Sequence, residues 1–245
     1  MSTRGLILRE VQYKEADKIL TVLTEDAGKL TVSAHGARRA RSKFTAASQL
    51  LAFSELDLYE RNGRWNLREG RTIELFSGVR QDIVRLSVGA YFAELLEAVS
   101  DVDYDDTNLL RLGLTALHVL SGGTRENALV KAAFELRLMC LAGYEPHVLS
   151  CPLCGAAEPL SPMLSLQEGH IHCGLHRPRG GGASAPLDAG SLAAMRHVVG
   201  AAEGRVFAFT LGEEGLHHLG TAAEDYVLTQ LERGFRTLDF LKQIR

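Results

Sequence analysis

The chain has 245 residues, of which 46% are hydrophobic and 23% are charged, and its formal net charge is −3. This length suffices for a packed core and for more than one module. A net negative chain cannot bind nucleic acid through its overall charge, and four cysteines in a chain of this size do not make a disulfide scaffold. The first residues lack the apolar region of a signal peptide and no stretch approaches a membrane span, so we expect a soluble, cytoplasmic protein.

Positive charge is nevertheless concentrated in one part of the chain. Residues 1–79 carry 13 Lys and Arg against 10 Asp and Glu, whereas residues 80–245 carry 14 against 20. Any nucleic acid would therefore be bound through a local patch near the N-terminus rather than by the protein as a whole.

Residues 1–79 predict a small β-barrel. Gly28 stands where a hairpin loop needs positive φ, and Asn62-Gly63 is a strong signal for a second hairpin. Short strands with a long connection between the third and the fourth are typical of an OB-fold, and an SH3-like barrel is the close alternative because strand count does not separate the two. The β-rich runs are Gly5–Val11, Lys18–Thr24, Lys29–Ala34, Leu56–Glu60 and Trp65–Arg68.

The long connection carries the basic patch. From Gly36 the chain reads Gly-Ala-Arg-Arg-Ala-Arg-Ser-Lys-Phe, and no acidic residue occurs between Asp26 and Glu55. Guanidinium groups bind phosphate through forked, charge-assisted donors, so we expect this loop to bind nucleic acid; a merely solvated loop is the alternative. The expected contacts are Arg38, Arg39, Arg41 and Lys43.

Two aromatic residues near this loop are candidate stacking platforms, because bases stack on aromatic rings irrespective of sequence. They are Phe44 and Trp65. A small barrel has few large apolar residues, so we favour a place in its core for both.

The pattern then changes to helical spacing, which predicts helices over Asp82–Ser100, from Asp106-Thr107 to Leu120, and over Asn127–Leu141. We expect them to form a bundle, the first part of a helical domain that spans residues 80–150. The acidic residues between the first two helices are expected to form a solvated loop with a capping role rather than a metal site. They are Asp101, Asp103, Asp105 and Asp106.

Residues 181–245 predict the C-terminal part of the helical domain. Helical patterns resume at about Ser191–Ala202 and Thr221–Arg233, with a short segment near Leu238–Ile244. These helices are too short to bury their apolar faces alone, so we expect them to pack back on the bundle.

Between the two helical parts, residues 151–180 predict an inserted zinc ribbon. Two pairs of residues give the spacing C-x2-C-x18-C-x2-H, and two tight turns can bring them around one tetrahedral ion, for which thiolate and imidazole donors suit Zn²⁺. Four protein ligands leave no open position, so the zinc would be structural. The expected ligands are Cys151, Cys154, Cys173 and His176.

Some details of this segment stay open. A dithiol redox pair or cysteines buried in a core are the alternatives to zinc, but neither explains the second pair. His170 and His172 also lie beside a cysteine, although only His176 repeats the spacing. Gly155 and Gly174 each follow a cysteine, where we expect positive φ. Residues 177–182 are expected to form a flexible connection.

The sequence lacks the signatures of common enzymes. It has no G-x-x-x-x-G-K-[ST], no G-x-S-x-G and no H-E-x-x-H, and none of its nine histidines is followed two residues later by Glu, as the zinc deaminases require. Cys140 falls inside a predicted helix and is expected to be a buried small hydrophobe. We therefore expect a nucleic-acid-binding protein that is not an enzyme.

Together these residues resemble the bacterial RecO family of recombination mediator proteins over nearly the whole chain. In that family the ribbon resembles C-x2-C…C-x2-C, whereas His176 stands in the last position here. The segments that carry the resemblance are Gly5–Arg9, Tyr13–Leu20, Leu23–Lys29, His35–Arg39, Ser42–Phe44, Phe92–Leu95 and Gly143–Pro146, the last leading into the cysteine motif.

The resemblance implies a multidomain α+β protein with an N-terminal OB-fold β-barrel, a central and C-terminal helical bundle and an inserted zinc ribbon. It also implies binding of single- and double-stranded DNA, annealing of complementary strands, and work with RecR to load RecA onto strands coated by single-stranded-DNA-binding protein, at the nucleoid. Two other functions stay open: an RNA-binding OB-fold and zinc-ribbon factor, and an interaction scaffold whose apolar grooves receive partner tails.

Overall fold

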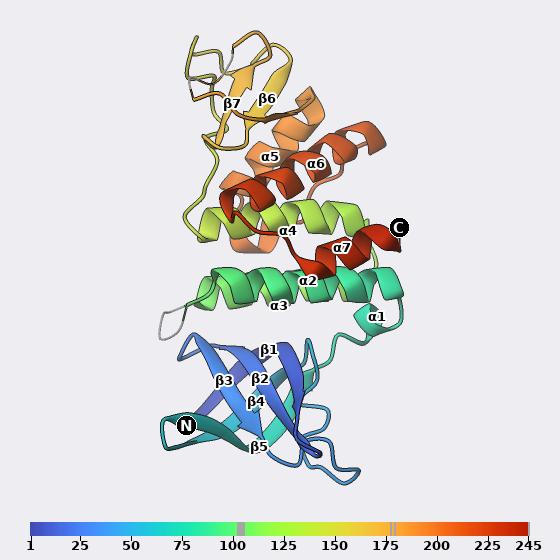
Figure 1. Cartoon of the computed structure of the whole chain (residues 1–245). Coiled ribbons are helices and arrows are strands. Elements are labelled where there is room, and N and C mark those ends of the chain that lie inside the picture. The colour runs from blue at the N-terminus through green and yellow to red at the C-terminus, as the bar shows by residue number, and fades with distance from the viewer. Residues whose placement is uncertain (102–105, 177, 179, 245) are drawn as a thin grey trace. The chain divides into compact units, whose positions relative to one another are not determined.

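The computed structural model describes residues 1–101, 106–176, 178 and 180–244. Asp103 and Asp105 of the acidic loop, and Arg177 and Arg179 of the expected connection, lie outside the described residues. The chain divides into two compact units. The barrel unit comprises Met1–Gly123 and the C-terminal segment from Phe235, and the ribbon unit comprises Thr124–Gly234. Figure 1 labels most elements of both units.

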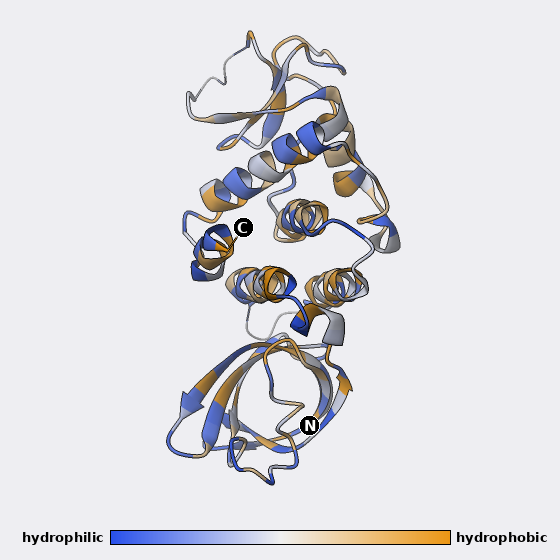
Figure 2. Ribbon diagram, turned by 90° about the vertical axis from the view of Figure 1, so that its right-hand side faces the viewer, coloured by the Kyte–Doolittle hydropathy of each residue, from blue (hydrophilic) through white to orange (hydrophobic). Residues whose placement is uncertain are grey.

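The barrel unit begins with a closed sheet in the order β1-β2-β3-β5-β4, which appears as a ring of strands in Figure 2. Strands β3 and β5 pair in parallel at the closure, while the other neighbours are antiparallel. This order identifies the OB-fold and decides against the SH3-like alternative. The strands are β1 (Ser2–Tyr13), β2 (Asp17–Thr24), β3 (Lys29–Ala34), β4 (Phe53–Arg61) and β5 (Arg64–Glu74).

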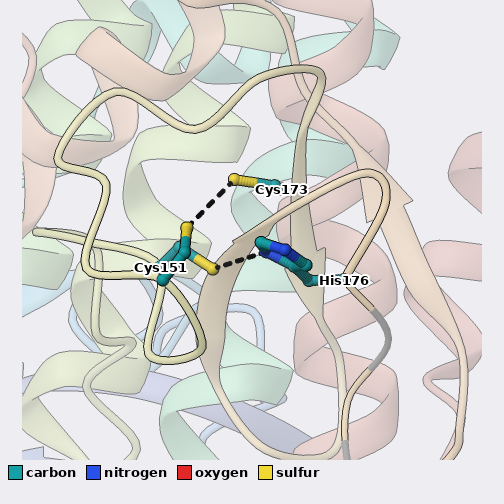
Figure 3. A group of neighbouring side chains, drawn as sticks. Cys151, Cys173 and His176 are labelled. Atoms are coloured by element: carbon teal, nitrogen blue, oxygen red, sulfur yellow. Dashed lines mark hydrogen bonds between the residues drawn. The ribbon is translucent and has the colours of Figure 1, made fainter.

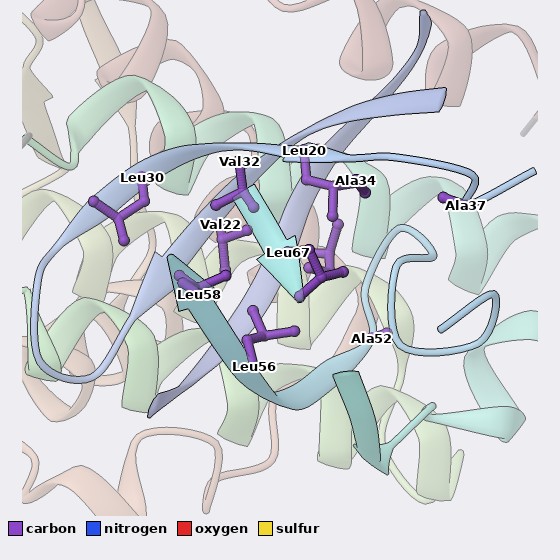
Figure 4. Close-up of a cluster of buried hydrophobic side chains, with 11 residues drawn as sticks. Leu20, Val22, Leu30, Val32, Ala34, Ala37, Ala52, Leu56, Leu58 and Leu67 are labelled. Carbon is purple, nitrogen blue, oxygen red and sulfur yellow. The ribbon is translucent and has the colours of Figure 1, made fainter. Parts of the chain in front are cut away.

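The core of the barrel follows from alternation along the strands. In β3 the buried Leu30, Val32 and Ala34 alternate with residues of the opposite face, among them Thr31 and Ser33. The inward side chains of the strands meet in one cluster, which two alanines of the β3–β4 connection complete (Figure 4). Its members are Ile7, Leu20, Val22, Leu30, Val32, Ala34, Ala37, Ala52, Leu56, Leu58 and Leu67.

The predicted turn chemistry is confirmed. Asn62 and Gly63 have φ values of 53° and 71°, so both central residues of the β4–β5 turn are left-handed, as a type I′ hairpin requires. Gly28, before β3, has φ 59°.

Helices α1 (Ser77–Arg80), α2 (Ile83–Val99), α3 (Thr107–Gly122) and α7 (Arg236–Gln243) complete the barrel unit. Helices α2 and α3 contact β1, and α7 packs on α2. The Asp82 side chain caps α2 by accepting a hydrogen bond from the amide of Arg85, and Gly123 with φ 63° ends α3. The last helix is held by the Tyr91 and Phe235 rings, whose centroids are 5.8 Å apart.

The ribbon unit combines helices with a small sheet. Helices α4 (Asn127–Leu141), α5 (Ala189–Gly200) and α6 (Glu213–Gln230) pack on one another, with a short 3-10 helix η1 (Glu203–Arg205). The sheet has the order β7-β6-β8, from β6 (Pro162–Ser165), β7 (His170–Cys173) and β8 (Ser184–Pro186). Helix α4 has the predicted bounds, whereas α6 begins at Glu213 rather than Thr221, because the buried Leu216 and Leu219 extend the helical pattern upstream.

Among the described residues, no helix is both long and apolar enough to cross a membrane.

Candidate metal centre and nucleic-acid interface

The four predicted metal ligands come together in the ribbon unit. Cys151 and Cys154 lie in a turn before β6, Cys173 ends β7, and His176 follows in the next turn. Their sulfur and ring-nitrogen atoms all lie within 4.8 Å of one another. Figure 3 shows Cys151, Cys173 and His176 turned toward a common centre.

The distances in this cluster can be compared with those around a tetrahedral zinc. Bonds of about 2.3 Å to sulfur and about 2.0–2.1 Å to nitrogen place two sulfurs about 3.8 Å apart and a sulfur and a nitrogen about 3.5 Å apart. Cys154 Sγ and Cys173 Sγ are 3.7 Å apart, and Cys151 Sγ and His176 Nδ1 are 3.5 Å apart. A disulfide would need about 2.05 Å between sulfurs. The four side chains could therefore hold one metal ion, and these two separations match those around a tetrahedral zinc.

Backbone hydrogen bonds shape the two turns that present the ligands. The amide of Gly155 donates to the Cys151 carbonyl at 2.8 Å, and that of His176 donates to the Cys173 carbonyl at 2.9 Å. Gly155 has φ 72°, as predicted. The prediction for Gly174 was wrong, since its φ is not positive; a Cβ there would lie 3.0 Å from the carbonyl oxygen of Ser161, so a larger residue would crowd that backbone.

The two buried thiols of the cluster differ in their tendency to ionise. Burial alone would raise the pKa of the Cys151 thiol, but hydrogen bonds from the backbone of Cys173, the His176 ring and the backbone of Leu153 and Cys154 together outweigh it and lower the pKa to about 5. Burial raises the pKa of the Cys173 thiol, and the neighbouring cysteines raise it further. One thiolate therefore forms readily and opposes a second, a repulsion that a bound cation would remove.

Neighbouring residues hold the ligands in place. His172 is buried with Nδ1 2.9 Å from the Cys173 carbonyl oxygen and Nε2 3.0 Å from Ser184 Oγ, so both ring nitrogens are engaged outside the cluster. Arg196 of α5 donates to the Val148 carbonyl at 2.8 Å and also contacts the carbonyl of Ala157, so it clamps both sides of the first ligand turn. Sequence analysis missed Arg196, because nothing local marks a contact made about 40 residues away.

Cys140 lies apart from this cluster, half-buried in α4. The expected full burial is therefore met only in part, although burial raises the pKa of its thiol to about 11 and makes it unreactive.

The basic loop lies in the barrel unit, between β3 and β4. Its four predicted cations have exposed side chains, and among the described residues no carboxylate forms an ion pair with any of them. The four are Arg38, Arg39, Arg41 and Lys43. A run of exposed, uncompensated cations gives a positive surface suited to phosphate.

The start of this loop is fixed to the turn between β1 and β2. The amide of Arg38 donates to the Ala16 carbonyl at 2.9 Å, and its Nη1 donates to the Glu15 carbonyl at 3.0 Å. Asp17 accepts a hydrogen bond from the amide of Gly36 at 2.8 Å and lies 2.9 Å from Nδ1 of His35. The loop therefore leaves the barrel in a defined direction rather than as a loose tail.

The barrel also carries a cavity that sequence analysis did not predict. Its volume is about 560 Å³, and it lies over the outer side chains of β2 and β3 beside the β4–β5 turn. Phe44 and Trp65 were expected in the core; both are only partly buried and pack against it, and Trp65 also lines this cavity. Only the alternation that sends Thr31 and Ser33 outward could have pointed to this face in advance.

The structure defines the class of protein first: an OB-fold barrel with associated helices and a Cys₃His cluster of metal-ligand geometry. Family models agree with this division. The model described as "Recombination protein O N terminal" matches residues 1–76, and "Recombination protein O C terminal" matches residues 80–239. The chain belongs to the recombination protein O (RecO) family of DNA repair proteins.

Individual relatives support this assignment, two of them over nearly the full length. The chain is similar to the DNA repair protein RecO of Acetivibrio thermocellus, with 31% identity over 249 residues that cover 100% of this chain and 97% of that protein. It is 29% identical to the RecO of Symbiobacterium thermophilum over 248 residues, covering 98% and 96% of the two chains. The RecO of Rubrobacter xylanophilus is 36% identical over 159 residues, covering 64% and 63%. The resemblance found in the sequence is confirmed.

Proposed function

We propose that this protein is a DNA-binding recombination mediator. It binds single- and double-stranded DNA, anneals complementary strands and, with RecR, promotes the loading of RecA on strands coated by single-stranded-DNA-binding protein. It is not an enzyme, it carries a structural Zn²⁺, and it works in the cytoplasm at the nucleoid. The observation that carries the proposal is the exposed basic loop, with its four uncompensated cations, on an OB-fold barrel of a DNA repair family.

The chemistry of annealing is compatible with such a surface. Two complementary strands repel each other through their phosphates, and a protein that neutralises phosphates on both lowers that repulsion without nucleotide hydrolysis. The mechanism requires cations held on a folded scaffold, since a mobile chain would lose more conformational entropy on binding. Hydrogen bonds from Gly36 and Arg38 to the β1–β2 segment supply this fixation.

The basic loop gives the first prediction. Replacing Arg38, Arg39, Arg41 and Lys43 by Ala should weaken binding of single-stranded DNA and flatten its salt dependence. Four phosphate contacts give log K against log[salt] a slope of about −3, which should approach zero in the variant. Fluorescence anisotropy at several salt concentrations measures both quantities.

A second assay tests the function itself. Complementary strands precoated with single-stranded-DNA-binding protein should anneal faster with wild-type protein than without it, in the absence of ATP, and the quadruple variant should lose this effect. A control variant that removes three exposed cations from the helices of the same unit, Arg111, Arg236 and Lys242, should retain it. Unchanged affinity and annealing in a folded quadruple variant would move the DNA-binding surface away from the loop.

A further inference from the structure

The cavity on the barrel is built from residues of four strands, and β1 contributes Tyr13 at its end. Strand β2 contributes Ile19, β3 contributes Thr31 and Ser33, and the start of β5 contributes Arg64 and Trp65. Its volume of about 560 Å³ lies within the range of about 300–1,000 Å³ that is usual for small-ligand sites. This is enough room for an unpaired base with its sugar.

The lining of this cavity favours a base over a phosphate. Among the described residues that line it, none is acidic, and Lys29 is already engaged: its Nζ donates to the carbonyls of Glu97, at 2.7 Å, and Ser100. Thr31 and Ser33 offer hydroxyl groups that can either donate to or accept from the edge of a base. The cavity therefore offers apolar surface and neutral hydrogen-bonding groups, with Arg64 as an exposed cation at its edge.

Two aromatic residues supply stacking surface. Trp65 follows Arg64 at the start of β5, and its half-buried indole contacts the barrel core while also lining the cavity. The core contact fixes the indole, so little conformational entropy is lost when a base stacks on it. Tyr13 is 47% exposed, and Lys14 Nζ lies 5.3 Å from the centroid of its ring. Stacking platforms beside cations are typical of sites for single strands.

We propose that this cavity binds unpaired bases of a single DNA strand against Trp65 and Tyr13, and that it releases them when the strand pairs. The inference rests on the proposed DNA-binding function and adds a discriminating step to it. A base inside a duplex is stacked and paired, and reaching a separate site would require flipping it out at a considerable energetic cost. The basic loop binds phosphates of either form, whereas the cavity binds only the unpaired form.

The consequence is that the barrel binds separate strands more tightly than the annealed product and so can release that product. While the strands are separate, both the loop and the cavity hold DNA. Once the strands pair, the base contacts are lost and only the salt-sensitive phosphate contacts remain, so the annealed product is bound more weakly than the substrate.

The sequence supplies a direct probe, because Trp65 is the only tryptophan of the chain. Titration with a short mixed-sequence single strand should quench tryptophan emission, and the same sequence as a duplex should not. Trp65→Ala should weaken single-strand binding about tenfold, the loss expected for one stacked base, and duplex binding by less than about twofold. Trp65→Phe keeps a ring and should restore most of the affinity. Phe240→Ala, on an exposed residue of α7, is the control and should change neither.

The release step needs a second measurement. The complementary strand is added to the complex of wild-type protein and single strand, and donor and acceptor dyes on the two strands report their pairing. Tryptophan emission should recover at the same rate as this pairing. Quenching that persists after pairing would overturn the release. Single-strand binding without quenching, together with unchanged affinity of Trp65→Ala, would overturn the base site while leaving the loop and the proposed function intact. Failure of wild-type protein to bind DNA at all would overturn both.

Discussion

At the scale of single residues, one carboxylate anchors the start of the basic loop to the barrel. Asp17 lies at the start of β2 and accepts a hydrogen bond from the amide of Gly36, while His35 contacts its other oxygen. Two hydrogen bonds lower the pKa of Asp17, first that from the Gly36 amide and then that from His35. The charges of His35 and Lys14 lower it slightly further, and burial opposes these effects. The sequence shows the run of cations but not this anchor, because Asp17 and Gly36 come together only through the pairing of β2 with β3.

The lowered pKa of Asp17 predicts a pH-dependent contribution to stability. A carboxylate whose pKa is lower in the folded than in the unfolded state stabilises the fold above its unfolded pKa of about 3.9, and the contribution is lost as pH falls through the folded pKa. Asp17→Asn should therefore be less stable than wild type at about pH 5, and the difference should vanish toward about pH 2. Urea unfolding at both pH values, followed by circular dichroism, measures it. A difference of equal size at both would mean that the charge of Asp17 has no role.

At the scale of elements, helix α4 shows that helical spacing alone does not tell whether a pair of charged residues is exposed or buried. Lys131 and Glu135 have the i,i+4 spacing of a surface pair, yet their side chains are 4% and 0% exposed. Lys131 Nζ lies 2.7 Å from Glu135 Oε1 and 2.8 Å from Glu224 Oε2 of α6, so the charges join two helices inside the ribbon unit. The bounds of α4 follow from local periodicity, but its burial on nearly all sides depends on α5 and α6, which are distant in the sequence.

Breaking this buried cluster should be costly. Lys131→Met leaves two carboxylates without their shared cation, and removal of one partner of a buried ion pair typically costs about 3–5 kcal/mol. Urea unfolding should show that loss in the ribbon unit. Lys131→Met combined with Glu135→Leu and Glu224→Gln should recover much of it, since apolar residues of similar volume often replace buried charges at little cost. Lys242→Met on the exposed end of α7 is the control. A loss below about 1 kcal/mol would show that the cluster is solvated in solution.

At the scale of the whole molecule, the sequence predicts modules better than it predicts how they group. Turn chemistry and alternation predict the barrel, and the C-x2-C and C-x2-H pairs predict the ligand cluster, because each depends on residues close in the chain. Grouping depends on long-range contacts: α7 packs on α2, whereas α5 and α6 pack on α4. Alternation along β3 indicates which face the cavity lies on, but the cavity beside Trp65 forms only through the β3–β5 closure. The domain boundaries at residues 79, 150 and 180 stay predictions from composition.

Metal removal tests whether the two units act separately. All four ligands belong to the ribbon unit, whereas the basic loop and the cavity belong to the barrel unit. Freshly purified protein should contain one zinc per chain by elemental analysis, and a strong chelator should lower the stability of the ribbon unit, because structural zinc is bound only by the folded site. The salt dependence of single-strand binding should not change.

The cysteines offer a matched pair of variants for this test. Cys154→Ser removes a ligand and should lose the metal, whereas Cys140→Ser, outside the cluster, should keep it. Both should bind single-stranded DNA like the wild type, because neither residue belongs to the barrel unit. Substoichiometric metal in the wild type would contradict the zinc site. DNA affinity that falls in step with metal loss would place a DNA contact in the ribbon unit. The barrel unit by itself would then not explain DNA binding.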